Sequence, residues 1–131
     1  MSIAKWCVLV ACVLPIATVG LAKLSTARLS KKSGGYDNNH PREWEAKLTG
    51  WHQRANAAQA NGFEALPLFI AGVLFAQMAQ TDQGRIDLLA LTFVGIRLAY
   101  VAAYLANLGT LRTLIWTAGL GVSIALLAMG I

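Results

Sequence analysis

Two stretches of otherwise apolar sequence carry side chains that could bind an anionic ligand or form ion pairs. In the first, Arg54, Asn61 and Glu64 stand at the start of an apolar run that continues to Ala79. At about 100° per residue, these three side chains fall within an arc of roughly 80° on one face of a helix. Ionisable side chains are costly in an apolar helix, so they are usually retained where they have a partner or a ligand.

The second stretch is Arg97, Tyr100 and Tyr104, inside the apolar segment from Leu88 to Leu108. These side chains fall within an arc of about 60° on a helix. Neither polar face should contact lipid, because unpaired polar groups are unfavourable there. We therefore expect both faces to line a helix interface or a water-filled cleft.

Two interpretations of these polar faces are compatible with each other. Glu64 and Arg97 could form a buried ion pair that sets the helix register, with Asn61 adding a hydrogen bond between helices. Alternatively, the same groups could form a polar ligand site at the cytoplasmic end of a helix bundle. Tyr100 and Tyr104 could also serve as anchors at the membrane surface.

The composition is that of a membrane protein rather than a soluble domain. Of 131 residues, 56% are hydrophobic and 13% are charged, and the mean hydropathy is +0.55. We expect one domain, residues 1–131, integral to the lipid bilayer. The net charge is +5, but seven of the eleven basic residues lie between Lys23 and Arg54. They do not form a stripe along a folded face, so nucleic-acid binding is not expected.

The apolar segments predict an all-α membrane protein, a four-transmembrane-helix bundle of up-down-up-down topology. Spanning segments must satisfy their backbone hydrogen bonds internally, and the alternating segments of a β-barrel are not visible. The Gly, Asn and Pro residues of the 23–50 loop should break any helix there. The predicted helices cover about 6–22, 51–79, 87–107 and 112–131.

Lysine and arginine residues predict the orientation. The 23–50 loop is rich in them, whereas the 80–86 turn contains only Arg85. By the positive-inside rule, the 23–50 loop is cytoplasmic and both termini lie on the opposite side, although Lys5 favours the reverse.

The remaining aromatic, cysteine and histidine residues predict no further chemistry. Cys7 and Cys12 lie in the first apolar segment and are expected to pack or to face lipid. His40 and His52 have no ligand spacing, so no metal site is expected. Three tryptophans are expected to anchor the protein at the membrane surface: Trp44, Trp51 and Trp116.

The residue patterns of these polar faces resemble those of the MAPEG superfamily, the membrane-associated proteins in eicosanoid and glutathione metabolism. The second helix carries the family pattern R-x(6)-N-x-x-E, and the third carries R-L-x-Y-x-x-x-Y, with a further arginine in the next turn. The length, the four helices and the long first loop also match, so the resemblance covers nearly the whole chain. The matching residues are Arg54, Asn61 and Glu64, followed by Pro67, then Arg97, Leu98, Tyr100 and Tyr104, then Arg112.

The resemblance implies a homotrimer that binds glutathione between subunits near the cytoplasmic face and takes a lipophilic substrate from the bilayer. Arginine recognises carboxylates through a rigid fork of donors, and Glu64 can accept from an ammonium group. Arg112 would lie near the sulfur and stabilise the thiolate, which is the nucleophile. The glutathione-binding residues would be Arg54, Asn61, Glu64, Arg97, Tyr100 and Tyr104.

The implied function is therefore a membrane glutathione-dependent transferase or peroxidase acting on lipophilic electrophiles. Ala57 stands where the eicosanoid-synthesising branch has a second arginine, and Ala65 stands where it often has tyrosine. The spacing from Tyr104 to Arg112 also looks one residue longer than in that branch. These departures favour a microsomal glutathione transferase-like protein of bacterial type, in the inner membrane, over a leukotriene synthase.

Two other classes of function remain open at this point. In the first, a non-catalytic MAPEG-like membrane protein uses its polar helix faces for trimer assembly or to bind another anionic ligand. In the second, a small transporter or channel has Arg97 and Glu64 lining a polar path, although no inverted repeat is visible.

Overall fold

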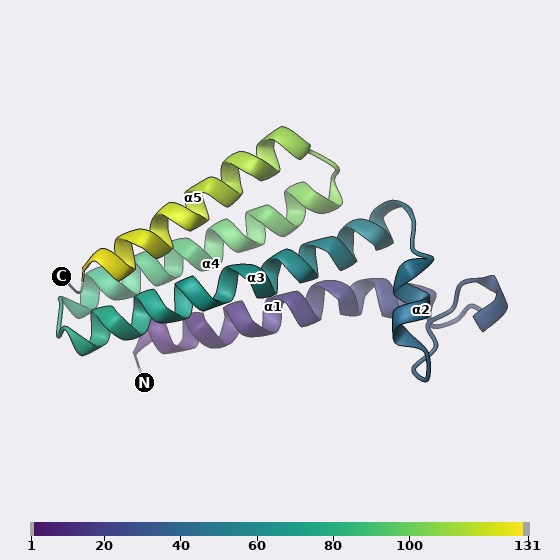
Figure 1. The fold of residues 1–131 in the computed structure, drawn as a ribbon, viewed down its shortest axis with the longest axis horizontal. Helices are drawn as coiled ribbons and strands as arrows, with labels where there is room; N and C mark the ends of the chain where they lie inside the picture. The colour runs from purple at the N-terminus through teal and green to yellow at the C-terminus, as the bar shows by residue number, and fades with distance from the viewer. Residues whose placement is uncertain (1, 130–131) are drawn as a thin grey trace.

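A computed structural model describes residues 2–129 and contains four long α-helices (Figure 1). Each of them is long and apolar enough to cross a membrane. No described residue forms a strand, so the predicted all-helical membrane fold is confirmed. The long helices are α1 (Ile3–Thr26), α3 (Gly50–Met78), α4 (Gln83–Leu105) and α5 (Gly109–Ala128); a 3-10 turn (Lys31–Ser33) and the short α2 (Pro41–Ala46) lie between α1 and α3.

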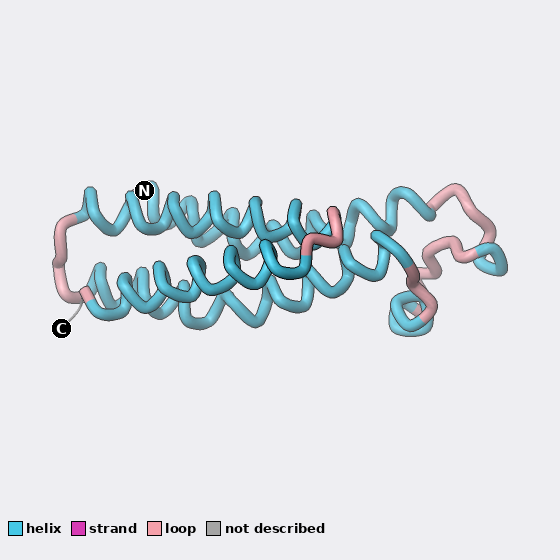
Figure 2. Tube along the Cα trace, turned by 90° about the horizontal axis from the view of Figure 1, so that it is seen from above, coloured by secondary structure: helices cyan, strands magenta, loops and turns pink. Residues whose placement is uncertain are grey.

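The helices α3 and α4 form the centre of the bundle. The helix α1 packs against both of them, and α5 packs against both as well. Consecutive long helices run in opposite directions, which is the predicted up-down-up-down arrangement (Figures 1 and 2). The start of α1, the end of α5 and the α3–α4 turn lie at one end, and the loop with α2 projects from the other.

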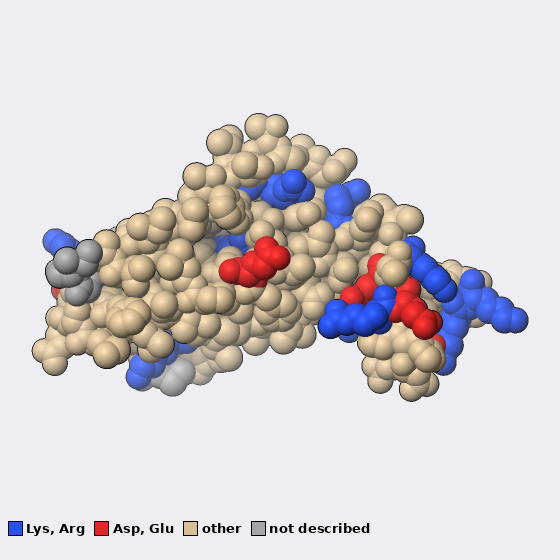
Figure 3. Space-filling model, in the orientation of Figure 1, with Lys and Arg blue, Asp and Glu red and all other residues tan. Residues whose placement is uncertain are grey.

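Most of the charged side chains in view lie around the loop end of the molecule. Figure 3 shows basic and acidic atoms together there, whereas the helical surface in view carries one acidic group near its middle with basic atoms close by and is otherwise largely uncharged. Large apolar side chains are exposed along the long helices, including Leu74, Leu88 and Leu114, which are all more than half exposed. An exposed apolar surface of this extent is suited to contact with lipid rather than water.

Capping groups, rather than apolar residues, set several helix ends. The helix α1 begins at Ile3, where the Ser2 hydroxyl accepts from the Lys5 amide at 3.4 Å, instead of near residue 6. The helix α4 begins at Gln83, where the Asp82 carboxylate accepts from the Arg85 amide at 2.9 Å, instead of near residue 87. A cap satisfies backbone donors that the helix leaves free, so a helix can start in polar sequence.

Left-handed residues and backbone hydrogen bonds close the short turns that follow α3 and α4. Gln80 adopts a left-handed conformation (φ 55°), and the Thr81 amide donates to the Ala76 carbonyl at 3.3 Å. Asn107 adopts the same conformation (φ 61°) at the end of α4. This closure satisfies carbonyls at the helix ends and brings the next helix back antiparallel.

The 23–50 loop departs from prediction in two respects. First, it contains α2, because proline is well tolerated as the first residue of a helix and Pro41 holds that position. Second, Trp44 is 6% exposed and is a core residue, not a membrane anchor. Its Nε1 donates to the Gly34 carbonyl at 3.2 Å, and its ring packs edge-on to Tyr36 at 5.0 Å. It packs in a cluster with Val19, Ala22 and Ala55.

A carboxylate of α4 caps the first turn of α1. Asp87 Oδ1 accepts from the Ala4 amide at 2.9 Å and from Gln83 Nε2 at 2.8 Å. We expect Asp87→Ala to destabilise the bundle by about 1–2 kcal/mol, because it leaves a helix N-terminal amide without an acceptor. Thermal unfolding in detergent measures this loss. Asp87→Asn keeps a side-chain oxygen and should retain most of the stability; equal unfolding temperatures for wild type and Asp87→Ala would contradict the capping role.

Candidate functional site

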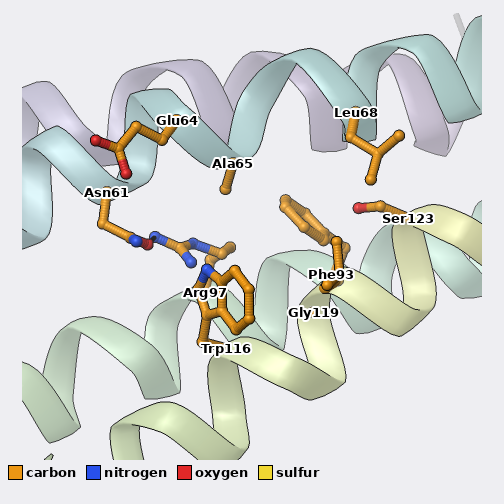
Figure 4. A pocket seen from close by; sticks show the side chains of 10 residues that line it. Asn61, Glu64, Ala65, Leu68, Phe93, Arg97, Trp116, Gly119 and Ser123 are labelled. Carbon is orange, nitrogen blue, oxygen red and sulfur yellow. Dashed lines mark hydrogen bonds between the residues drawn. The ribbon is translucent and has the colours of Figure 1, made fainter.

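A cavity of about 250 Å³ lies between α3, α4 and α5 (Figure 4). We call it the main cavity. One end is polar, where Asn61, Glu64 and Arg97 meet, and the other end is mostly apolar. Its lining comes from α3 (Asn61, Glu64, Ala65, Leu68), α4 (Phe93, Arg97) and α5 (Trp116, Gly119, Leu120, Ser123).

A second space of about 190 Å³, the side cavity, adjoins the polar end of the main cavity. Asn61 and Trp116 line both spaces, so they form the boundary between them. The other lining residues of the side cavity are Tyr100, Arg112 and Thr113. The side cavity therefore adds a second cationic group to the region.

Arg97 is a buried cation, and no carboxylate among the described residues forms an ion pair with it. It is 5% exposed, and its Nη2 donates to Asn61 Oδ1 at 3.0 Å. Its Cζ lies 4.1 Å from the centroid of the Tyr100 ring, a cation–π geometry. The ion pairs among the described residues all lie in the loop: Lys31–Asp37, His40–Glu43 and Arg42–Glu45.

The predicted ion pair between Glu64 and Arg97 is therefore wrong within this chain. Glu64 is exposed and lies beside the polar end of the main cavity (Figure 4). Three residues along a helix turn a side chain by about 60°, so Asn61 faces α4 while Glu64 is rotated towards the outside. Asn61, and not Glu64, is the side chain that reaches Arg97 from α3.

A row of aromatic rings connects Arg97 with Arg112. The Tyr100 and Tyr104 rings meet edge-on with centroids 5.7 Å apart, and the Cζ of Arg112 lies 4.2 Å from the Tyr104 ring centroid. Arg112 occurs in the first turn of α5, where its amide donates to the Leu108 carbonyl. The turn at Asn107 thus brings Arg112 back beside α4, despite the longer spacing from Tyr104.

Arg54 lies apart from the cavities. Its Nε donates to the carbonyl of Leu105, the last residue of α4, at 3.2 Å. A cation is favourable at a helix C-terminus, where carbonyls lack partners within the helix. Arg54 therefore has a structural partner that the sequence pattern does not reveal, and its predicted ligand role stays a prediction.

The histidines have ordinary polar partners. His52 Nε2 lies 2.8 Å from the Ser25 hydroxyl, and the His52 ring stacks on Trp51 at 4.0 Å. His40 Nδ1 lies 3.9 Å from Glu43. Among the described residues, no group of three or more His, Cys, Asp and Glu side chains lies close enough to hold a metal ion.

The cavities also involve side chains that the sequence did not point to. Trp116 was expected to be a membrane anchor; it is 40% exposed and also lines both cavities. Phe93 and Ser123 line the main cavity and are 2% exposed. Three of the lining residues of α5 are three and four positions apart, a spacing that predicts one shared helix face: Trp116, Gly119 and Ser123.

The comparison with protein families agrees with this architecture. A model described as the MAPEG family matches residues 3–131, nearly the whole chain. The comparisons with curated proteins and with solved structures gave no match. The match covers all four membrane-spanning helices and every residue of the two cavities. The chain therefore belongs to the MAPEG family.

Proposed function

We propose that this protein is an integral membrane glutathione-dependent transferase or peroxidase that acts on lipophilic electrophiles. The observation that carries the proposal is Arg97, a buried guanidinium at a cavity wall with no carboxylate partner among the described residues. A buried charge needs a compensating group, and a ligand carboxylate would supply it.

The groups around the two cavities fit the charges of glutathione, which has two carboxylates and one ammonium. Arg97 offers a carboxylate the N–H donors that Asn61 does not occupy. Glu64 is exposed and forms no ion pair within residues 2–129, so it can accept from the ammonium. Asn61 adds an amide at the boundary of the two cavities, and Tyr100 lines the side cavity. The binding role of Tyr104 would be indirect, because its ring supports Arg112.

Arg112 is the proposed catalytic residue. Glutathione, when bound, would supply a thiolate nucleophile. Arg112 lines the side cavity and would favour the ionised sulfur through its positive charge. Trp116 and the apolar lining of the main cavity would exclude water from the reacting groups. The lipophilic electrophile would enter from the bilayer.

We also propose a homotrimer in a bacterial inner membrane, with the 23–50 loop cytoplasmic and both termini on the opposite side. Glu64 and Phe63 are exposed on a membrane-spanning helix, and a carboxylate facing lipid is unfavourable. Figure 3 shows an acidic group in the middle of a nearly uncharged face, with basic atoms close by. A second copy that covers this face would shield the carboxylate and complete the glutathione site between subunits.

Calorimetry of glutathione binding to the detergent-purified protein tests the proposal. We expect wild type to bind and Arg97→Gln to bind at least about tenfold more weakly, because a hydrogen bond to a charged group is lost. Glutamine can still donate to Asn61, so the bundle should persist. The matched control is Arg85→Gln, which removes an exposed charge at the other end of α4 and should bind like wild type.

The absence of binding to wild type would contradict the proposal and favour a non-catalytic family member. In that alternative, the polar faces serve trimer assembly or bind another anionic ligand, and the exposed Glu64 is the observation in its favour. It predicts that Glu64→Gln disrupts the oligomer on native gels with no dependence on glutathione.

A further inference from the structure

The apolar end of the main cavity contains one hydroxyl group with no hydrogen-bond partner among the described residues, that of Ser123. The residue is 2% exposed, and Figure 4 shows its oxygen directed into the cavity between Leu68 and Phe93. All enclosed side-chain N and O atoms of the described residues have partners, so the Ser123 oxygen is in contact with the cavity space.

Other hydroxyls in the helices behave differently. Those of Thr18, Thr92 and Thr117 each donate to the carbonyl four residues earlier, at 2.8–2.9 Å. This bond is the usual way to satisfy a hydroxyl in a membrane-spanning helix. Ser123 does not make it, although a buried hydroxyl without a partner is unfavourable. Its donor is therefore available to a molecule in the cavity.

The shape and lining of this end restrict the molecule that fits. Its walls include Leu68, Phe93 and Leu120, with Trp116 towards the polar end. The whole main cavity, at about 250 Å³, is smaller than the roughly 300–1,000 Å³ of pockets for drug-sized ligands. The Phe93 ring at this end, the Trp116 ring towards the polar end and the single donor suit a compact, neutral, flat molecule that carries a hydrogen-bond acceptor.

The two cavities allow this molecule to lie beside a second ligand. Asn61 and Trp116 border both spaces, whereas Arg112 belongs to the side cavity and Ser123 to the main cavity. We propose that the apolar end of the main cavity binds the lipophilic acceptor substrate, a compact aromatic electrophile, and that the Ser123 hydroxyl donates to its acceptor group. The role of the bound molecule as a substrate rests on the proposed function, whereas the binding site itself does not.

The test uses meta-dinitrobenzene, a flat nitroaromatic compound without a leaving group, and no glutathione. Its binding is followed by quenching of tryptophan fluorescence in one fixed detergent, with Trp116→Phe identifying the contribution of Trp116. We expect Ser123→Ala to raise the Kd about fivefold, the usual effect of one neutral hydrogen bond. We expect Ala65→Leu to raise the Kd further, because the larger side chain occupies the cavity.

The matched control is Thr117→Val, which removes an exposed hydroxyl of α5 that lies outside both cavities and should leave the Kd unchanged. Equal Kd values for wild type and Ser123→Ala, or for wild type and Ala65→Leu, would overturn the inference. Glutathione calorimetry on Ser123→Ala should match wild type. If wild type binds dinitrobenzene in a Ser123-dependent manner but does not bind glutathione, the proposed function fails and the subsite stands.

Discussion

Arg112→Ala is expected to abolish formation of the glutathione thiolate and to slow conjugation roughly 100- to 1,000-fold, the usual cost of removing one electrostatic group from a site of developing charge. Arg112 lines the side cavity, and its guanidinium is held over the Tyr104 ring at 4.2 Å. The thiolate can be measured by its ultraviolet absorbance when glutathione is added, and conjugation by the release of the leaving group of an electrophile.

The position of Arg112 argues for a functional rather than a stabilising role. It lies in the first turn of α5, where the helix dipole disfavours a positive charge. Alanine is the best helix former, so Arg112→Ala should not unfold α5. Arg112→Lys keeps the charge but not the planar fork of donors, and should recover only part of the rate. A thiolate signal in Arg112→Ala equal to that of wild type would remove Arg112 from the mechanism.

Gly72→Ala is expected to destabilise the protein by about 1–3 kcal/mol, the usual range for overpacking a close contact. A Cβ at Gly72 would lie 2.9 Å from the Cβ of Leu126 and 2.9 Å from the Ser123 carbonyl oxygen. The carbonyl belongs to the backbone of α5, so α3 and α5 would have to separate. Small residues at helix contacts allow this close approach in membranes.

Gly95→Ala is the matched control for Gly72→Ala. It makes the same chemical change inside α4, but a Cβ there meets nothing within 4 Å. Alanine is up to about 1 kcal/mol better than glycine in a helix interior, so this variant should unfold at or above the wild-type temperature. Thermal unfolding in detergent compares the two variants, and equal stability would show that α3 and α5 are not in the contact described.

The pattern of residues alone predicted the class of fold and part of the candidate site. Long apolar runs and one basic loop indicate four spanning helices in an antiparallel order, because a spanning segment has no alternative to hydrogen bonding within itself. Helical spacing also placed Asn61 and Arg97 on faces that avoid lipid, and the structure joins them at 3.0 Å. These inferences need only local periodicity and the cost of polar groups in hydrocarbon.

The tertiary structure decided which apolar residues are inside. Lipid tails are as apolar as a protein core, so hydrophobicity does not distinguish a lipid-facing residue from a packed one. Leu88 and Phe93 lie in the same apolar run, yet Leu88 is 64% exposed and Phe93 is 2% exposed. The shapes of the packed helix surfaces decide which apolar residues are buried. For example, Gly72 has no side chain and allows α3 to approach α5 closely.

The same limit applies to polar partners that come from distant parts of the chain. Arg54 donates to the Leu105 carbonyl, and Trp44 donates to the Gly34 carbonyl, although backbone acceptors leave no mark in the sequence. Glu64 was expected to reach Arg97, but a rotation of about 60° on α3 directs Asn61 there instead. The sequence by itself thus determined the helices, their order and the polar faces; the packing of α3, α4 and α5 decided the partners and the cavities, because both depend on helix rotation and separation.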